Sequence, residues 1–317
     1  MGRAVSSALT GRLDPDRIGL APTQRYAGCL APSAWFRMVA IEALEQSMAM
    51  ASRVPTRPVS LGAGRTEPQC DTCALNPICL PVAVSNADLH RLETIIERGR
   101  PLQRGDHVFR AGDLFGSIYA VRSGAVKTYR LTPEGDEQVM GFHLPGELFG
   151  LGGLGSGRHP NNALALETAS VCEVPFTRIE SLSQELPGLQ RHLFQRLGRE
   201  ISDDEQLLVL LTKRSAEERI AALLVSLSAR YRRRQLSDTR FRLPMSRGDI
   251  GNYLGLVMET VSRVLTRLQN QGVIQVTGRE VQIMEPRSLR EIAGTQIQLH
   301  GDFEPSEARP TCAAEAY

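Results

Sequence analysis

Residues 246–272 read SRGDIGNYLGLVMETVSRVLTRLQNQG, and this stretch decides the fold at the C-terminal end of the chain. Ser246 is a suitable helix N-cap, and Asp249, three residues later, can complete a capping box. Gly255 provides the left-handed residue that ends such a helix. A second helix is then predicted over 258–271, so the stretch forms two short helices joined by a glycine turn.

The second helix of this pair is amphipathic. Its predicted inner face consists of Val261, Val264, Leu265 and Leu268. Its predicted outer face carries Glu259, Ser262, Arg263 and Arg267, and the first three share one side of the helix. Arginine can bond O6 and N7 of guanine, glutamate can accept from N4 of cytosine, and serine can contact several bases. The pattern predicts a helix-turn-helix that binds DNA, although an ordinary helix pair with solvated charges has the same pattern.

The surroundings of these helices also favour DNA binding. Residues 273–276 and 281–284 resemble the two-stranded wing of a winged helix. Residues 230–290 contain twelve arginines, no lysine and five acidic residues, a local excess of seven positive charges. The whole chain has 37 Lys and Arg against 35 Asp and Glu, a net charge of +2. A basic C-terminal domain in a nearly neutral chain indicates an anionic partner.

The sequence pattern of residues 101–180 is typical of β-strands. Apolar and polar residues alternate in short runs, such as SIYAV at 117–121 and AVKTY at 125–129, and glycines separate the runs. Many short strands with glycine turns predict a small antiparallel barrel or sandwich.

Residues 184–211, between these two regions, have helical spacing. Apolar residues and one acid recur at intervals of three and four: Leu193, Leu197, Ile201, Asp204, Leu208 and Leu211. Two interpretations fit this heptad-like pattern, a helix packed on its own domain or a helix that dimerises as a coiled coil. In a dimer, Asp204 would face its symmetry mate, oppose pairing and keep the dimer weak.

The chain has six cysteines, and three of them fall within ten residues. Cys70, Cys73 and Cys79 form a C-x2-C-x5-C run, whose thiolates can converge on one metal centre. A fourth ligand has to come from elsewhere, and the candidates are Cys172, Cys29, Cys312 and the histidines. A [4Fe–4S] cluster, a zinc ion and a redox or structural role all fit the run. By itself, a lone cysteine in a β-strand such as Cys172 is typical of a core residue.

Length and composition set broad limits. The 317 residues suggest about two domains. No stretch has the ~18 uninterrupted apolar residues of a membrane span. Residues 1–20 lack the apolar core of a secretory signal. We therefore expect a cytoplasmic protein with reduced thiols and no membrane partner.

Catalytic patterns are missing from the sequence. The glycine-rich run at 150–157 does not open a helix after a strand and is not followed by Lys-Ser/Thr, so it is not a phosphate loop. The six histidines have no metalloprotease spacing. Cys172 with His143 would lack a third group to activate a nucleophile. We expect no enzymatic activity and no small-molecule substrate.

Barrel, long helix and winged helix, in this order, resemble the CRP/FNR transcription regulators. The similarity runs from about Gln69 to Ala293. It becomes specific in the cysteine run, GDEQ (135–138), GFHL (141–144), ET (167–168), VCEVPF (171–176), AEER (216–219), GDIGNYLG (248–255) and ETVSR (259–263). Together these segments look like the FNR branch, the oxygen-sensing fumarate and nitrate reduction regulators.

The resemblance implies an α+β fold with a cyclic-nucleotide-binding-like antiparallel β-barrel, a long dimerisation helix and a C-terminal winged helix-turn-helix. The expected parts are a poorly organised extension (1–65), a cysteine-rich cluster-binding segment with a short helix over 86–99 (66–100), a barrel sensor domain (101–185), the dimerisation helix (186–214), the DNA-binding domain (215–294) and a flexible tail (295–317). Residues 1–60 have no counterpart in the resemblance. Two interpretations fit them: a real N-terminal extension, or a protein whose translation starts at Met48 or Met50.

The resemblance also implies a site and a mechanism. Cys70, Cys73, Cys79 and Cys172 would bind one [4Fe–4S] cluster per subunit, and the cluster would support a homodimer that binds DNA. Oxygen would convert the cluster to a [2Fe–2S] form and then remove it, so that the dimer weakens and DNA binding is lost. The protein would thus regulate anaerobic metabolism.

Individual residues acquire roles by the same resemblance. Glu259, Ser262 and Arg263 fall on base-reading positions for inverted repeats of TTGAT-like half-sites. Asp204 falls where an acid keeps the cluster-free protein monomeric. RNA polymerase is the expected partner of such an activator, and the barrel loop near Gly135 and Asp136 is a candidate contact or simply a solvated turn.

Two related functions remain as alternatives. A cyclic-nucleotide regulator needs a Gly-Glu turn and, later, an arginine followed by a small hydroxyl residue and alanine. Gly146-Glu147 is present, but the later segment 157–160 reads GRHP, which lacks the hydroxyl residue and loses a backbone donor at Pro160. A zinc ion at the four cysteines would give a constitutive DNA binder.

Overall fold

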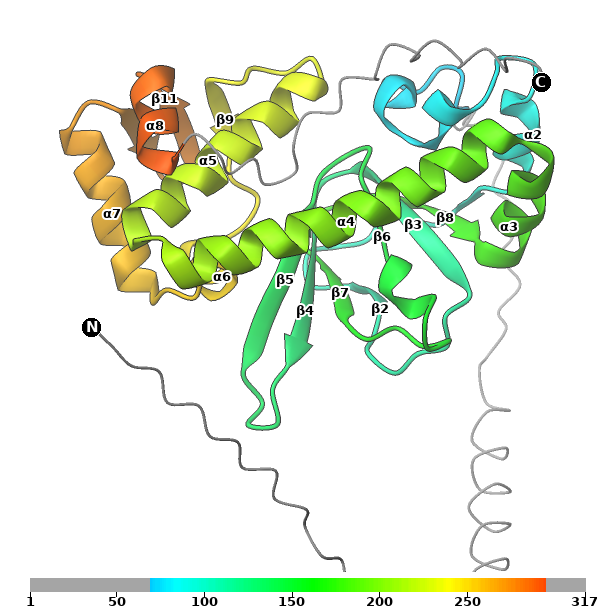
Figure 1. Ribbon diagram of the computed structural model, residues 1–317, viewed down its shortest axis with the longest axis horizontal. Coiled ribbons are helices and arrows are strands. Elements are labelled where there is room, and N and C mark those ends of the chain that lie inside the picture. The colour runs from blue at the N-terminus through cyan, green and yellow to red at the C-terminus, as the bar shows by residue number, and fades with distance from the viewer. Residues whose placement is uncertain (1–68, 295–317) are drawn as a thin grey trace, which may run out of the picture. The chain divides into compact units, whose positions relative to one another are not determined.

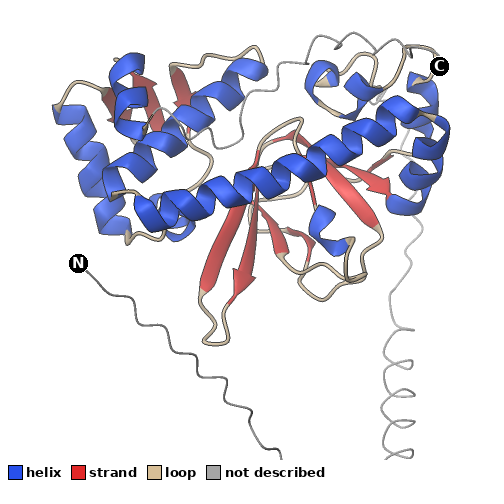
Figure 2. Cartoon of the chain, in the orientation of Figure 1, coloured by secondary structure: helices blue, strands red, loops and turns tan. Residues whose placement is uncertain are grey.

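The computed structural model describes residues 69–294, and Figure 1 shows the order of their elements. The expected extension (1–65), the tail (295–317), Cys29 and Cys312 lie outside the described residues. The described part is an α+β fold with a β-barrel, a long helix and a C-terminal domain of helices and short strands (Figure 2). This confirms the fold class predicted from the sequence.

The barrel consists of two four-stranded antiparallel sheets. The first sheet has the order β1 (Glu97–Arg98), β8 (Ser170–Pro175), β3 (Ser117–Ser123) and β6 (Leu148–Phe149). The second has the order β2 (His107–Phe109), β7 (Asn162–Ala165), β4 (Val126–Leu131) and β5 (Glu137–His143). A 3-10 turn, η3 (Leu151–Gly153), follows β6.

The segment before the barrel differs from the prediction. The helix expected over 86–99 is a single short helix, α2 (Leu89–Thr94), and the chain then becomes extended in β1. Glu97 and Arg98 pair with Glu173 and Cys172 of β8. Pairing with a strand distant in sequence overrides the helical spacing at this point, and no local pattern could have revealed it.

Two helices follow the barrel, α3 (Phe176–Glu185) and the long α4 (Pro187–Lys213). Figure 1 shows α4 running across the barrel from α3 to the C-terminal domain. Proline suits the first turn of α4, where its missing amide hydrogen would have no helical partner. Neither α4 nor any other helix in residues 69–294 is long and apolar enough to cross a membrane.

The C-terminal domain begins with α5 (Ala216–Arg233), which a capping box of Ser215 and Glu218 opens. It continues with β9 (Arg240–Arg242), α6 (Arg247–Leu254), α7 (Met258–Asn270), β10 (Ile274–Thr277), β11 (Glu280–Ile283) and α8 (Pro286–Ala293). β10 and β11 form the predicted wing, and β9 adds a third strand beside β11. β9 escaped sequence reasoning because only Phe241 of its three residues is buried.

Two hydrophobic clusters hold these parts together. One joins barrel residues such as Phe142 to the helices of the C-terminal domain, where Phe142 packs edge-on against Tyr253 at 5.2 Å. The other surrounds Leu92 and Ile118, and half-buried Cys79 and Cys172 pack against it. Apolar packing therefore fixes the cysteine segment on the barrel.

Candidate functional site

Four cysteines from two distant segments line one small cavity. Cys70, Cys73 and Cys79 precede the barrel, and Cys172 lies in β8. Most of the remaining lining is apolar: Leu75, Leu80, Pro81, Ile96, Ala120, Val121 and Val174. None of the four is in a disulfide. Of the candidates for a fourth ligand that lie within residues 69–294, the structure brings Cys172 to the run of three.

Short turns aim the N-terminal cysteines at this cavity. Cys79 lies between two 3-10 helices, η1 (Asn76–Ile78) and η2 (Leu80–Ala83), and each begins with a proline in its first turn. The side-chain amide of Asn76 donates to the carbonyl of Cys70 at 2.9 Å. This bond closes the loop, so that Cys70 and Cys79 face the same cavity.

Burial favours the protonated form of three thiols, those of Cys70, Cys79 and Cys172. It raises the thiol pKa of Cys70 to about 11 and that of Cys79 to about 12. Burial also raises the pKa of Cys172, although Arg98 and Arg122 act in the opposite direction. A thiophilic metal centre would displace these protons on binding.

The four thiols line a common cavity. Within residues 69–294, no group of three or more His, Cys, Asp or Glu side chains is arranged to hold a single metal ion. Soft sulfur donors are the ligands that zinc and iron–sulfur centres prefer.

The predicted helix-turn-helix is present with its expected caps. The Asp249 amide donates to Ser246 Oγ at 3.0 Å, and the Ser246 amide donates to Asp249 Oδ2 at 2.9 Å. Gly255 ends α6 with φ 63°, in the left-handed region. A Cβ at Gly251 would lie 2.5 Å from the Leu256 carbonyl oxygen, so the close approach of the turn requires glycine there.

One face of α7 is open to a ligand. Its buried residues are those of the predicted inner face, Val261, Val264, Leu265 and Leu268. The Glu259 and Arg263 side chains are 80% and 75% exposed, and their charged ends lie 3.9 Å apart. The hydroxyl of half-buried Ser262 accepts from Arg247 Nη1 at 3.1 Å.

Arg267 was expected on the same face, one turn further along α7. Its side chain is 65% exposed, as expected, and its guanidinium lies 3.2 Å from Glu217 of α5, an ion pair inside the domain. The two arginines of α7 therefore differ in their surroundings, and Arg263 is the one whose partner is another residue of the exposed face.

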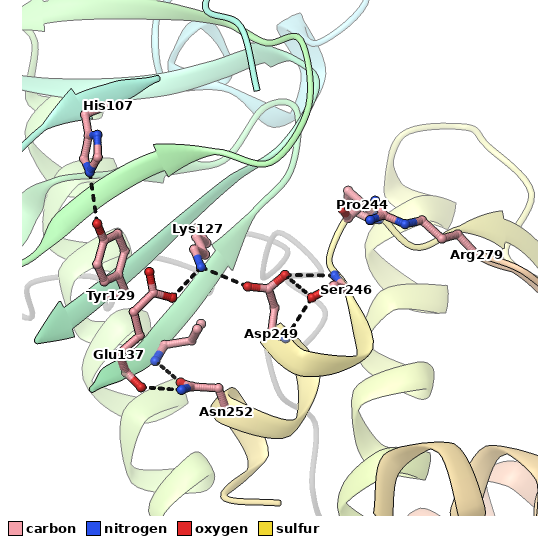
Figure 3. A network of polar contacts seen from close by, with 10 residues as sticks. His107, Lys127, Tyr129, Glu137, Pro244, Ser246, Asp249, Asn252 and Arg279 are labelled. Atoms are coloured by element: carbon pink, nitrogen blue, oxygen red, sulfur yellow. Dashed lines mark hydrogen bonds and ion pairs between the residues drawn. The ribbon is translucent and has the colours of Figure 1, made fainter. Parts of the chain in front are cut away.

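Polar contacts tie α6 to the edge of the barrel (Figure 3). Lys127 Nζ of β4 lies 2.7 Å from Glu137 and 2.9 Å from Asp249. The side chain of Asn252 in α6 bonds backbone groups of β5 at Glu137 and Val139. The Asp249 carboxylate thus caps α6 and also anchors it to the barrel.

This double role predicts a pH-dependent stability. Burial alone would raise the pKa of Asp249, but hydrogen bonds from Ser246 and Lys127 outweigh it and hold the pKa below its ordinary value. A lowered folded-state pKa contributes stability above the unfolded pKa of about 3.9, and this is lost as pH falls through the folded pKa.

We expect Asp249→Asn to lower the free energy of unfolding at pH 7 by about 1.5–3 kcal/mol. The difference from wild type should begin to shrink as the pH falls below about 3.9 and should vanish once the pH lies below the lowered folded-state pKa, because the wild-type carboxyl is then also neutral. Urea unfolding at stepped pH measures this. Asp136→Asn, on the exposed β4–β5 turn, is the control; an equal pH dependence in both variants would contradict the assignment.

A buried ion cluster ties α5 to the barrel. The Glu147 carboxylate accepts from Arg230 Nε at 2.9 Å and from Arg234 Nη2 at 2.6 Å. The two arginine side chains are 1% and 4% exposed. Arg230 also donates to the Phe142 carbonyl, and Arg234 donates to that of Pro145 at 2.7 Å. Sequence reasoning missed this cluster, since Glu147 lies more than eighty residues from both arginines.

The same contacts bear on the cyclic-nucleotide alternative. Glu147 is the glutamate of the Gly-Glu turn, and both its oxygens are engaged by α5, with a further bond from the Leu144 amide at 2.9 Å. Arg158 donates to the Gly112 carbonyl at 2.6 Å. A nucleotide would have to break buried ion pairs to use this carboxylate.

Helix α4 has one face packed within the chain and one face exposed. Half-buried Leu193 and Leu197 pack against the cluster around Leu92, and Leu211 is also half-buried. Asp204 is exposed. Four large apolar residues are exposed and form what we call the α4 stripe: Phe194, Ile201, Leu208 and Val209. The predicted heptad pattern is thus divided between two faces, and its spacing did not reveal Phe194 and Val209.

Two domain families match the described region. Residues 99–185 match the cyclic nucleotide-binding domain, and residues 218–292 match the Crp-like helix-turn-helix domain. Transcriptional activator protein anr of Pseudomonas aeruginosa is 52% identical over 229 residues, which cover 72% of this chain and 94% of that protein. The fumarate and nitrate reduction regulatory protein of Escherichia coli is 45% identical over 225 residues, 71% of this chain and 90% of that protein.

The fold agrees with these relatives. The structure of FixK2 from Bradyrhizobium japonicum matches with a TM-score of 0.57 and 31% identity, covering 63% of this chain and 98% of that one. The relatives are transcription regulators and not enzymes, as expected for this sequence. On sequence, fold and domain order, the chain is a DNA-binding transcription regulator that belongs to the CRP/FNR family, in its FNR branch.

Proposed function

We propose that the chain is an oxygen-responsive regulator of anaerobic metabolism that carries one [4Fe–4S] cluster per subunit. Cys70, Cys73, Cys79 and Cys172 would hold the cluster. A homodimer formed through α4 would bind inverted repeats of TTGAT-like half-sites. The observation that carries the proposal is that four cysteines from distant segments line one cavity in a protein whose helix-turn-helix has an exposed, charged face on α7.

The residues at the cavity suit such a cluster. Four thiolates are the usual ligand set of a [4Fe–4S] centre, and the apolar lining limits access of solvent to it. The cluster would supply an oxygen-labile group. The chain itself supplies the ligands, their apolar cover and the connection to the rest of the fold.

One turn of the barrel connects the cysteine segment to α5. A Cβ at Gly146 would lie 2.8 Å from Ile78 Cδ1 and 3.8 Å from Leu75 Cδ2, so the cysteine segment packs directly on this turn. The next residue, Glu147, holds Arg230 and Arg234 of α5. These contacts support a mechanism in which ordering of the cysteine segment shifts the preferred position of the DNA-binding domain.

A second connection leads to α4. Cys79 and Cys172 pack against the same hydrophobic cluster as Leu193 and Leu197 of α4. A change in the packing of the cysteine segment would therefore alter contacts on the inner face of α4. The outer face of the same helix carries the α4 stripe. A dimer across that stripe would present two copies of α7 to the two halves of an inverted repeat.

RNA polymerase is part of the same proposal, since an activator has to contact it. The turn between β4 and β5, with Gly135 and exposed Asp136, is the candidate surface carried over from the resemblance. A merely solvated turn has the same appearance.

The decisive experiment is purification without oxygen, followed by a visible absorption spectrum and then admission of air. We expect a broad iron–sulfur band that bleaches in air. Cys172→Ser should abolish the band and Cys29→Ser, at a cysteine without an assigned role, should retain it. A colourless protein that contains zinc would leave DNA binding intact and discard oxygen sensing. A protein that stays colourless after reconstitution with iron and sulfide would contradict the proposal.

For DNA reading, we expect Arg263→Ala to weaken binding to a TTGAT-type site by about 1–3 kcal/mol and to relax selectivity at one base pair. Arg267→Ala, one turn further along α7, removes the same charge from an arginine that pairs with Glu217 and should cost less. Gel-shift titrations with wild-type and single-base-changed sites measure both. If the two variants lose the same affinity for every sequence, Arg263 does not read a base.

A further inference from the structure

A partly buried ion pair lies beside the cysteine cavity. Arg98 Nη2 of β1 is 3.2 Å from Glu93 Oε1 of α2, and the two side chains are only 14% and 16% exposed. The same nitrogen donates to Cys70 Sγ at 3.7 Å. Glu93 Oε1 also accepts the amide hydrogen of Cys70 at 3.0 Å. Cys70 is therefore contacted through its sulfur by Arg98 and through its backbone by Glu93.

Arg98 is also adjacent to the barrel cysteine. β1 and β8 are antiparallel, and Arg98 stands directly opposite Cys172. Side chains of directly opposed residues project from the same face of a sheet, with Cβ atoms about 4.5–5.5 Å apart. One guanidinium thus lies beside a cysteine of the N-terminal segment and beside the cysteine that β8 contributes.

The positive charge of Arg98 beside the cysteine cavity is suited to a bound iron–sulfur cluster. Thiolates bound to an iron–sulfur core form a centre with net negative charge, and such charge is costly to bury without a cation or hydrogen-bond donors. Hydrogen bonds to the sulfurs and nearby charge also set the reduction potential of a cluster. A guanidinium held in place by a carboxylate supplies both at once.

We infer that Arg98 is a positioning and charge-compensating residue for the iron–sulfur centre, held in place by Glu93. It keeps Cys70 beside Cys172 and offsets the negative charge of the bound cluster. This inference rests on the cluster proposed above. It concerns two residues that the cysteine spacing does not reveal.

The test uses the full chain, reconstituted without oxygen with iron and sulfide. We expect Arg98→Gln to lose its cluster to an iron chelator about 10–100-fold faster than wild type, which is the usual range for residues that support metal ligands. The midpoint potential should fall, because a positive charge that favours the reduced state has been removed. Arg98→Lys, which keeps the charge, should recover most of the potential but less of the chelator resistance.

Arg91→Gln is the matched control. Arg91 lies on α2, and its ion pairs with Asp88 and Glu185 are exposed. It should leave cluster retention and potential unchanged. Thermal unfolding of the cluster-free variants checks the fold; if Arg98→Gln does not fold, Glu93→Gln should give the same direction of change. Wild-type behaviour of Arg98→Gln would overturn the inference alone, whereas a wild-type chain that takes up no cluster would overturn the proposed function with it.

Discussion

Glu147→Gln is expected to lower the free energy of unfolding by about 3–5 kcal/mol, the usual cost of breaking a buried ion pair on one side. The substitution keeps the size of the side chain but removes its charge. Arg230 and Arg234 would then be two almost fully buried guanidiniums without a counter-ion. The loss would act where α5 meets the barrel, because the glutamate belongs to the barrel and both arginines to α5 or its C-cap.

Urea unfolding of the cluster-free protein, followed by circular dichroism, measures this cost. Glu137→Gln is the matched control, since Glu137 also pairs with a buried cation, Lys127, but is itself 41% exposed. We expect that control to change stability by about 1 kcal/mol or less. If both variants lose the same free energy of unfolding, the Glu147 ion cluster does not stabilise the contact between the barrel and α5 more than an exposed ion pair does.

The helix-turn-helix of the C-terminal domain could be predicted almost residue by residue. The N-cap at Ser246, the left-handed Gly255 and the inner face of α7 all follow from signals within a few residues of one another. Such signals are local, and the packing of the domain agrees with them. The ion pair between Arg267 and Glu217, which lies fifty residues away, does not follow from such local signals.

The barrel and the cysteine site were predictable only in part. The alternation of apolar and polar residues between glycines predicts the type of architecture, but it does not predict which strands pair. The two residues of β1 were therefore predicted as the end of a helix over 86–99. Cysteine spacing gives three residues of the cavity, and the fourth, Cys172, is brought there by the pairing of β8 with β3 and β1. Arg98 owes its surroundings to the same pairing of β1 with β8, and Glu147 owes its surroundings to the packing of α5 on the barrel. No sequence period encodes either contact.

Helix spacing also left open which face of α4 is covered. The structure answers for the monomer: Leu193 and Leu197 pack inward, while the α4 stripe is exposed. Asp204 and Glu205 flank the stripe, about 50° to either side of the line through Ile201 and Leu208 at ~100° per residue. An apolar stripe with an acid on each side suits a weak dimer, which forms only when another interaction offsets the repulsion between the acids.

The second large effect is therefore expected at this stripe. Ile201→Lys should raise the dissociation constant of the cluster-loaded dimer by two orders of magnitude or more, since each of two copies loses about 1.5–3 kcal/mol of apolar burial. Asp204→Ala should act in the opposite direction and give a dimer that persists in air. Glu205→Ala should do the same if the acid on the other flank also repels its counterpart.

Sedimentation equilibrium over a range of protein concentrations, with and without air, measures all three variants. Gln195→Lys is the control for added charge, because it places a lysine on the same helix about 100° around from Phe194. If Gln195→Lys weakens the dimer as much as Ile201→Lys, charge alone is responsible and the stripe is not the interface. If Asp204→Ala stays monomeric after oxidation, the acids do not oppose association, and the weakness of the cluster-free dimer must come from the inner face of α4 instead.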